Sequence, residues 1–408
     1  MEIVITAMNL FKHQQDLIDA FPQRHCLIWG CGTGKTRTAI ELAKKVGGVF
    51  LVICPKALKG NWANEIKKWD GGEARIVSKE EFRRDWENIG PYKCVICDES
   101  HFFFGRNSAM MKSLRSYFKR NHTQYRYLLT ATAYCSTPWN IYRMCELIGR
   151  PMDYMAFDRK FFNHIKMGAR MVPIIKKGIE PEIAEIVKSV GSTISLEDCL
   201  DVPEQVFETE YFDLTAQQKK AIEGLTDTEH IVRFTKIHQI AGGTLKSDGY
   251  EPDKVFSCLK MDRLKDIVKD NPRVVIVCRY NNEINVLFDK LIDIKGGNVD
   301  RITGEVSAED RHNTIERLKT MDSYVLLVNA ACSVGWELPQ CPLMVFYSYD
   351  FSLVNYIQVL GRIQRINNVK RNTYLSLVTR ETIDEDIFKA VTIKKMTFQI
   401  EIYKPPQM

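Results

Sequence analysis

The sequence predicts an α/β fold in which two parallel-sheet domains follow one another, separated by a short helical middle segment. A chain of 408 residues and 47.2 kDa is too long for one ordinary hydrophobic core. Short apolar runs alternate with longer amphipathic stretches, which is the rhythm of βα units around a parallel sheet. This rhythm occurs twice. We therefore expect domains at residues 1–150 and 212–408, with a helical linker or insertion at 151–211.

Ten apolar runs are the expected strands. In the first domain they cover residues 26–29, 49–54, 74–77, 93–97 and 125–129. In the second they cover residues 273–278, 299–303, 324–328, 343–347 and 373–378. The fourth run carries Cys94 and Cys97 at CxxC spacing, and residues three apart on a strand point to opposite faces. Because no second pair accompanies them, we expect buried strand cysteines rather than a zinc site.

Helix signals are clearest in and after the middle segment. Four aliphatic residues repeat at helical spacing between Pro181 and Gly191, namely Ile183, Ile186, Val187 and Val190. Two pairs have the spacing of capping boxes that open helices, Thr215 with Gln218 and Ser307 with Asp310. Whether the middle segment has a function or only packs between the domains stays open.

Composition excludes several classes of protein. Hydrophobic residues make up 45% and charged residues 26% of the chain, so it is neither disordered nor fibrous. The longest uncharged stretches, 127–142 and 323–336, are too short and too polar to span a bilayer. An acid at Glu2 and the lack of a basic start argue against a secretory signal. The twelve scattered cysteines indicate a reducing cytosol. The charge balance, 57 − 51 = +6, permits an anionic partner without requiring one.

The sharpest chemical signal is the stretch 30–36, Gly-Cys-Gly-Thr-Gly-Lys-Thr, which follows a strand and precedes a helical stretch. Glycines let backbone N–H groups approach phosphate oxygens, and a helix N-terminus favours negative charge. Lys35 would reach the β- and γ-phosphates and the Thr36 hydroxyl would bind Mg²⁺. The strict P-loop pattern requires glycine at the position of Trp29. Strand, glycine-rich turn and helix together nevertheless predict a nucleotide site.

A carboxylate pair follows another strand. Asp98 and Glu99 come directly after the run 93–97, at the carboxyl end where ligands bind in α/β sheets. Asp98 would bind Mg²⁺ through its water shell, and Glu99 would polarise the attacking water. Together with the P-loop, this pair predicts ATP hydrolysis.

These motifs resemble those of superfamily-two helicases, and most closely those of Swi/Snf-type DNA translocases. Four segments are similar to helicase motifs I, II, III and VI: GTGKT at 32–36, DESH at 98–101, LTAT at 129–132 and QVLGRIQR at 358–365. Three more resemble Swi/Snf features: LFKHQ at 10–14, the run 52–58 with its tail at 61–69, and TIDE at 382–385. The resemblance covers nearly the whole chain and implies two RecA-like domains.

The resemblance also implies roles for single residues. Gln14 would read adenine, while Gly32, Thr33, Gly34, Lys35 and Thr36 would hold ATP and Mg²⁺. Thr130 and Thr132 would couple the nucleotide state to the grip on DNA. Arg362 and Arg365 would reach the γ-phosphate from the second domain, with Gln358 and Gly361 shaping their loop. Motif V would lie at Asn329–Leu338 around Gly335, although Trp336-Glu337 replaces the usual Leu-Asn.

Nucleic-acid contacts follow from the same resemblance. Five residues fall in loops where this family touches a phosphate backbone: Lys56, Ser78, Lys79, Arg279 and Tyr280. For any one of them a solvated surface position is an equal alternative. Three aromatic residues at 102–104 suit core packing beside motif II better than a stacking platform for bases.

We therefore predict an ATP-dependent DNA translocase or helicase that acts on duplex or branched DNA with weak sequence preference. ATP and Mg²⁺ are the expected cofactors, a membrane is not an expected partner, and protein partners stay open. The compact chain carries no recognisable bromo-, chromo- or zinc-binding extension, so we expect a cytoplasmic enzyme of a bacterium or a phage-infected host rather than a nucleosome remodeller. The alternatives are a DEAH-type RNA helicase and a nucleotide-dependent DNA clamp that does not move.

Overall fold

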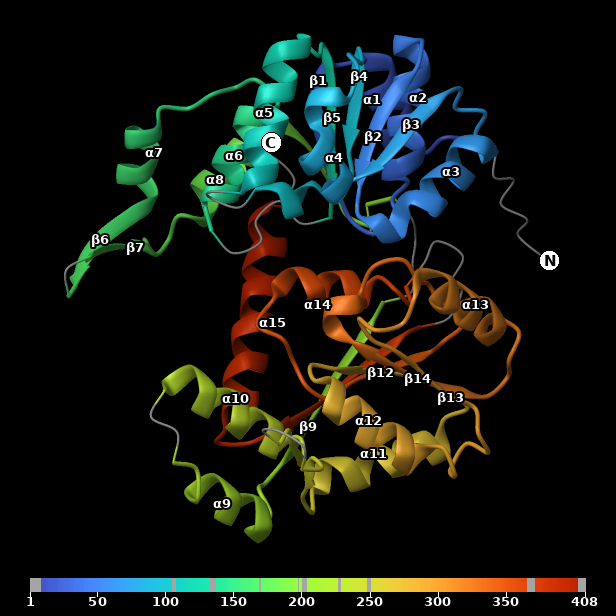
Figure 1. Cartoon of the computed structure of the whole chain (residues 1–408), viewed down its shortest axis with the longest axis vertical. Helices are drawn as coiled ribbons and strands as arrows, with labels where there is room; N and C mark the ends of the chain where they lie inside the picture. The colour runs from blue at the N-terminus through green and yellow to red at the C-terminus, as the bar shows by residue number, and fades with distance from the viewer. Residues whose placement is uncertain are drawn as a thin grey trace. The chain divides into compact units, whose positions relative to one another are not determined.

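The structure is a computed structural model that describes residues 9–402 apart from 105–107, 132–136, 169, 197, 200–203, 227–228, 248–250 and 365–370. Contacts between residues group the chain into two units, Met1–Asp201 with Thr397–Met408 and Val202–Met396. Each unit is built on one six-stranded sheet (Figure 1).

All strands of the first sheet are parallel, in the order β3-β2-β4-β5-β1-β8. Their bounds are β1 (Arg24–Trp29), β2 (Phe50–Cys54), β3 (Ala74–Ser78), β4 (Cys94–Cys97), β5 (Tyr125–Thr130) and β8 (Gly191–Ile194). β2 and β4 are buried along their whole length, because helices cover both faces of a parallel sheet. The five strands predicted for this domain are confirmed, and β8 is an addition at the edge.

Helices cover both faces of this sheet. They are α1 (Lys12–Ala20), α2 (Lys35–Val46), α3 (Lys59–Lys68), α4 (Lys79–Asp85), α5 (Ala109–Asn121), α6 (Trp139–Leu147), α7 (Tyr154–Phe161) and α8 (Glu180–Val190), with short 3-10 turns η1 (Lys56–Leu58), η2 (Trp86–Asn88) and η3 (Ser100–Phe103). α1, α2 and α3 contribute to the core on one face, and α4, α5, α6 and α8 to the core on the other. Cys94 packs in the first of these cores and Cys97 in the second, as their strand spacing predicted.

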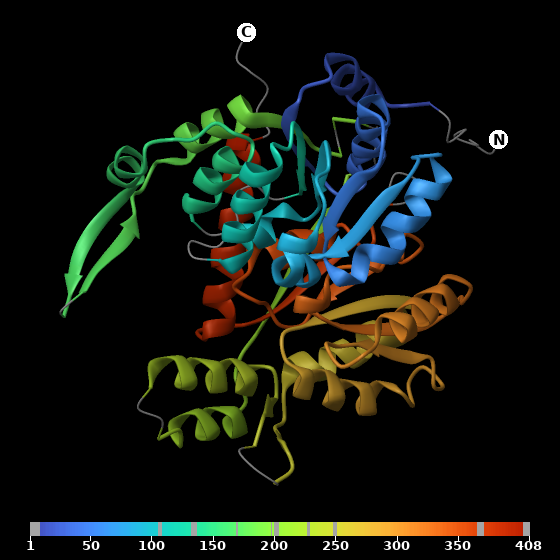
Figure 2. The ribbon, with the colours of Figure 1, turned by 45° about the horizontal axis from the view of Figure 1, so that its top comes forward.

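The middle segment differs from its predicted form. α8 confirms the expected helix, but the residues before it form α7 and an antiparallel ribbon of β6 (Phe162–Met167) and β7 (Arg170–Ile175). In Figures 1 and 2 this ribbon extends away from the sheet of its own unit. The segment 151–211 also divides between the units, because β8 pairs with β1 whereas β9 (Val206–Phe212) pairs with β16 of the second sheet.

The second sheet has the order β13-β14-β12-β15-β16-β9, and all its strands are parallel. Besides β9 it contains β12 (Arg273–Cys278), β13 (Val299–Ile302), β14 (Tyr324–Asn329), β15 (Leu343–Phe346) and β16 (Thr373–Thr379). These five match the five predicted runs, so the prediction of two parallel-sheet domains is confirmed. A small ribbon pairs β10 (Thr244–Leu245) with β11 (Lys254–Val255).

The helices of the second unit are α9 (Ala216–Glu223), α10 (His230–Ala241), α11 (Leu259–Asp270), α12 (Asn281–Leu291), α13 (Ala308–Lys319), α14 (Leu353–Leu360) and α15 (Ile383–Ile402), with one 3-10 turn, η4 (Ala330–Cys332). α11 and α12 pack on one face of the sheet, and α13, α14 and α15 on the other. Thr215 and Gln218 form the predicted capping box. Ser307 caps α13, and its hydroxyl also donates to the Asp310 carboxylate at 2.7 Å. Among the described residues, no helix combines the length and the apolar character that crossing a bilayer demands.

Candidate active site

The P-loop lies between β1 and α2 of the first unit, as the sequence predicts. Gly32 and Gly34 both have positive φ angles, +79° and +85°, which a glycine adopts without strain. Gly34 also caps α2, and a Cβ there would overlap the side-chain amide of Gln14. Lys35 Nζ donates to the carbonyls of Trp29 and Gly30 at 2.7 and 2.8 Å. The loop thus folds around Lys35, whose ammonium group is hydrogen-bonded by the loop's own carbonyl oxygens.

Trp29 stands where the strict P-loop pattern has glycine. It is the last residue of β1, is fully buried, and its indole N–H donates to the Ser192 hydroxyl on β8 at 2.8 Å. Gly30 N donates to the carbonyl of Ile194 on the same strand at 2.7 Å. The tryptophan therefore ties the start of the P-loop to the edge strand that the sequence did not predict.

Gln14 braces the P-loop. Its Nε2 donates to the Gly34 carbonyl at 3.0 Å and to Thr38 Oγ1 at 3.1 Å, and its Oε1 accepts from Phe11 N at 2.9 Å. With 1% of its surface exposed, the side chain is committed to these partners. The neighbouring His13 also contacts the loop, through Nε2 at 2.9 Å from the Thr33 carbonyl. The structure thus places Gln14 against the phosphate loop, and its reading of adenine stays a prediction.

Asp98 and Glu99 emerge from the end of β4 and are both buried. Asp98 Oδ2 accepts from Trp62 Nε1 at 2.8 Å, and Oδ1 accepts from Glu99 N at 2.9 Å. Burial, reinforced by the charge of Glu99, raises the pKa of Asp98 to about 6 despite these bonds and the nearby Lys35. Trp62 was recognised in the sequence as part of the tail of motif Ia. Nothing in the sequence indicated that its indole positions the Asp98 carboxylate.

His101 connects the carboxylate pair to motif III. Its Nδ1 lies 3.3 Å from Glu99 Oε2 and 3.0 Å from the hydroxyl of Thr130, the last residue of β5. Burial, with Lys79 and Lys35 nearby, lowers the pKa of His101 to about 3, so its ring is neutral at pH 7. Glu99, His101 and Thr130 therefore form a continuous polar path. Thr132, the other threonine predicted for motif III, lies outside the described residues.

The donors at this site suit Mg²⁺. Magnesium prefers oxygen ligands and is usually bound by one or two carboxylates together with substrate phosphates and water. The Thr36 hydroxyl at the start of α2 and the Asp98 carboxylate are donors of this kind. The raised pKa of Asp98 reflects two buried carboxylates side by side, a charge that a divalent cation would offset. We therefore name Thr36 and Asp98 as the residues that would hold Mg²⁺.

In the second unit, Arg362 joins motif VI to motif V. It follows α14 and is buried, with Nε donating to the Gln358 carbonyl at 3.1 Å and a terminal nitrogen to the Trp336 carbonyl at 3.4 Å. These bonds hold Arg362 within its own unit, and its reach to a γ-phosphate stays a prediction. Arg365, the second arginine of this motif, lies outside the described residues.

Motif V itself is well packed. Gly335 has a φ angle of +87°, which explains the glycine, and Gln358 Oε1 accepts from the Ser333 hydroxyl at 2.9 Å. Trp336, the departure from the family pattern, is buried in the core, and its indole N–H donates to the Cys332 carbonyl at 3.0 Å. Gly361 caps the end of α14.

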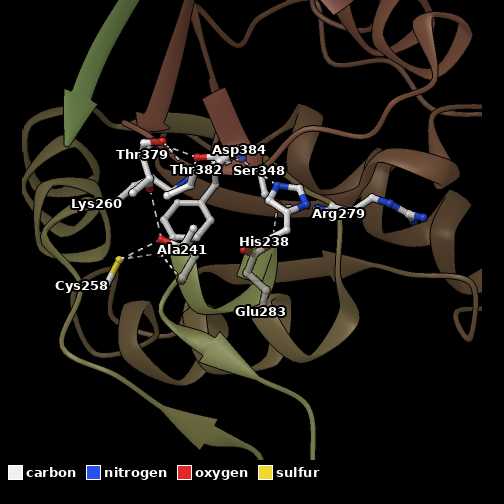
Figure 3. Close-up of polar contacts among 12 residues, drawn as sticks. His238, Ala241, Cys258, Lys260, Arg279, Glu283, Ser348, Thr379, Thr382 and Asp384 are labelled. Carbon is white, nitrogen blue, oxygen red and sulfur yellow. Dashed lines mark hydrogen bonds and ion pairs between the residues drawn. The ribbon is translucent and has the colours of Figure 1, made fainter. Parts of the chain in front are cut away.

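The loop after β12, which carries Arg279 and Tyr280, rests on a buried charged network (Figure 3). The Tyr280 hydroxyl lies 3.0 Å from His238 Nδ1, and His238 Nε2 lies 3.2 Å from Asp384 Oδ1. Asp384 Oδ2 accepts from Lys260 Nζ at 2.7 Å, and both side chains are almost fully buried. Asp384 is part of the TIDE segment, so the network joins this segment to the loop. Tyr280 is thereby a structural residue as well as a candidate DNA contact.

The other candidate DNA contacts differ in how exposed their side chains are and in the partners they already have. Lys56 is exposed on η1, directly after β2, whereas Ser78 is buried and uses its hydroxyl to cap α4. Lys79 Nζ lies 4.4 Å from the centroid of the Phe102 ring, and Phe102 is 39% exposed. Arg279 lies 3.6 Å from Asp350. The interpretation of residues 102–104 as core therefore holds for Phe103 and Phe104 but not for Phe102.

The fold is that of two RecA-like units in tandem, and the first of them carries a P-loop beside a buried carboxylate pair. Residues 259–367 match the family model described as Helicase conserved C-terminal domain. The chain is 21% identical to the chromodomain-helicase-DNA-binding protein 1-like of Danio rerio, over 92% of this chain and 42% of that protein. It is 23% identical to the ISWI chromatin-remodeling complex ATPase ISW1 of Saccharomyces cerevisiae, over 91% of this chain and 38% of that protein.

Among solved structures, the Sulfolobus solfataricus SWI2/SNF2 ATPase core in complex with dsDNA aligns with a TM-score of 0.41 and 17% identity, covering 97% of this chain and 93% of that one. The chain spans less than half the length of the two curated relatives named above. Together with the motifs, the sequence matches support a superfamily-two helicase of the Swi/Snf type.

Proposed function

We propose that this protein is a DNA-dependent ATPase that translocates on duplex or branched DNA, with ATP and Mg²⁺ as cofactors and the cytoplasm as its location. The observation that carries the proposal is the hydrogen bond from Trp62 to Asp98. It connects the tail of motif Ia, the segment that separates the Swi/Snf resemblance from the DEAH one, directly to the carboxylate of motif II. This connection favours a DNA translocase over a DEAH-type RNA helicase.

The residues of the first unit account for ATP hydrolysis. Lys35 would exchange its two loop carbonyls for phosphate oxygens, while the N–H groups at the start of α2 face the same anion. Glu99 would accept a proton from the attacking water. Bound Mg²⁺ would neutralise phosphate charge as the reaction proceeds. Asp98 would keep its orientation because both of its oxygens accept hydrogen bonds from the protein.

Coupling to DNA would use the path through His101. A change at Glu99 is passed to Thr130 at the end of β5 by one neutral imidazole, without any exposed group between them. A nucleotide-dependent clamp could use the same path to change its grip on DNA, so movement along DNA is what distinguishes a translocase from the clamp.

The test measures ATP turnover with single-stranded, duplex, forked and four-way DNA and with duplex RNA, using Lys35→Ala as the inactive control. Stimulation by DNA well above RNA supports the proposal, and the reverse order would establish the RNA helicase instead. Displacement of a third strand from a DNA triplex in the presence of ATP then tests movement. DNA-stimulated turnover without displacement would establish the clamp.

A further inference from the structure

The ribbon formed by β6 and β7 has no part in the ATP site. Its base is anchored in the core of the first unit, where the buried Phe162 ring stacks on Trp139 with centroids 5.1 Å apart. Beyond this base both faces reach solvent, and the ribbon extends away from the sheet of its unit (Figures 1 and 2). A two-stranded ribbon gains little stability by itself in water. The projecting ribbon is therefore a candidate surface for contact with another molecule.

Charge points to the class of that molecule. Residues 159–179 contain six Lys or Arg and no Asp or Glu, a local charge of +6. The whole chain carries 57 − 51 = +6, so the remaining residues sum to zero. Among the described residues, Lys166 and Arg170, which flank the turn of the ribbon, are exposed and form no ion pair. Two of the six cations thus lie on the ribbon itself, which carries no Asp or Glu, and a cationic projection is complementary to a polyanion.

The strand register sorts the side chains by face. Ile165 pairs with Val172 and Asn163 with Ile174, and paired residues share a face, so Ile165, Val172 and Ile174 line one side. Ile165 and Ile174 are 42% and 44% exposed. On the other side Lys166 pairs with Met171, which is 59% exposed. The ribbon therefore offers aliphatic surface beside cations rather than cations alone.

We propose that the β6–β7 ribbon is a second DNA contact that selects branched DNA, with Lys166 and Arg170 binding backbone phosphates and Ile165 and Ile174 packing on bases at the branch point. This inference rests on the proposed function and names its substrate class. Intact duplex hides the faces of its bases in the stack, whereas a fork or junction exposes them next to converging phosphates. Apolar side chains contact unstacked bases in other proteins that distort DNA. The combination on the ribbon therefore matches a branch better than a continuous duplex.

The test measures the affinity of the full chain for forked and duplex DNA of equal length, as a function of salt. The double variant Lys166→Ala/Arg170→Ala should weaken binding to both DNAs on the order of tenfold at low salt and reduce the slope of log K against log salt by about 2. The double variant Ile165→Ser/Ile174→Ser should weaken binding to the fork by roughly fivefold or more and leave duplex binding close to that of the wild type.

The matched control is Lys265→Ala/Lys269→Ala on α11, which removes one half-buried and one exposed lysine that are already paired with Asp262 and Asp266. Thermal unfolding of every variant separates lost contacts from lost folding. If wild-type turnover responds to no DNA, the proposed function itself is wrong. If the wild type responds to DNA but both ribbon variants bind fork and duplex as tightly as it does, the ribbon is not a DNA contact. Equal losses on fork and duplex from the isoleucine variant would contradict the selection of branches.

Discussion

Asp98 is held by the protein through both carboxylate oxygens, and this places it correctly before any ligand arrives. The Glu99 amide reaches one oxygen as a neighbour in sequence, but the Trp62 indole reaches the other from 36 positions away. Glu99 itself has a backbone in the left-handed region, with φ +45° and ψ +48°. Such conformations cost energy in non-glycine residues and are enriched at functional sites.

Glu99→Gln should bind ATP nearly as well as the wild type and hydrolyse it about 10²–10⁴ times more slowly, because the amide keeps the shape of the side chain but cannot accept a proton as a base. Nucleotide affinity by fluorescence titration and DNA-saturated turnover check the two halves separately. A loss of ATP affinity as large as the loss of turnover would show that Glu99 is not the general base.

Trp62→Phe should raise the Mg²⁺ concentration that supports half-maximal ATP hydrolysis by about 10- to 100-fold, the usual effect of removing a partner that orients a ligand. Phenylalanine keeps the aromatic packing but no longer donates to Asp98. Trp69→Phe is the matched control, because its indole N–H, at the end of the same helix, donates to Glu65 instead at 2.7 Å. An equal Mg²⁺ requirement in both variants would remove Trp62 from the site.

At the scale of elements, the second unit is held together by Asp384 at the start of α15. This carboxylate accepts from Lys260 of α11 and from Thr379 N at the end of β16, and it contacts His238 of α10. Burial by itself raises the pKa of Asp384, but Lys260 and His238 outweigh burial and hold the pKa below its ordinary range. Three helices and one strand therefore depend on a single charge.

Asp384→Asn should lower the free energy of unfolding of the protein by about 3–5 kcal/mol at pH 7, because Lys260 is left as a buried charge without its partner. The stabilisation by a carboxyl with a depressed pKa is present above the pKa of the unfolded chain, about 3.9, and is lost as the pH falls toward the folded value. The difference between wild type and variant should therefore shrink below about pH 4.

Denaturant unfolding of both proteins from pH 7 to pH 3 measures this difference. Asp386→Asn is the control, since Asp386 lies two residues further along α15 and is exposed. A difference between wild type and Asp384→Asn that is unchanged down to pH 3 would mean that the charge of Asp384 does not stabilise the fold.

At the scale of the whole molecule, the net positive charge equals that of one short segment, residues 159–179. Outside residues 159–179 the positive and negative charges of the chain sum to zero. Contacts by Lys and Arg with phosphates carry no sequence information, because every nucleotide presents the same backbone.

DNA binding by the whole protein should therefore depend weakly on sequence and strongly on salt. With 6–10 phosphate contacts the affinity would fall by about 10³–10⁵ between 50 and 200 mM salt. Fluorescence anisotropy with DNAs of unrelated sequence checks both expectations. A footprint on one sequence that survives high salt would contradict them.

The sequence by itself determined the two sheets and the nucleotide loop. Strands such as 50–54 and 324–329 are continuous apolar runs because helices cover both faces of the sheet, and this pattern is legible without the fold. The P-loop can also be recognised in the sequence, because the backbone groups that would bind phosphate all belong to one contiguous segment, residues 30–36. β8 and β9 were missed because polar residues interrupt their apolar runs, as in Gly191–Ile194 and Val206–Phe212.

Only the tertiary structure decided which side chains meet. The bonds from Trp62 to Asp98, from Gln14 to the P-loop and from Arg362 to the Trp336 carbonyl join residues 20 to 36 positions apart. No periodicity encodes such contacts, because they depend on which faces of separate elements the packing brings together. For the same reason the sequence did not indicate that Arg362 donates to the carbonyls of Gln358 and Trp336 within its own unit.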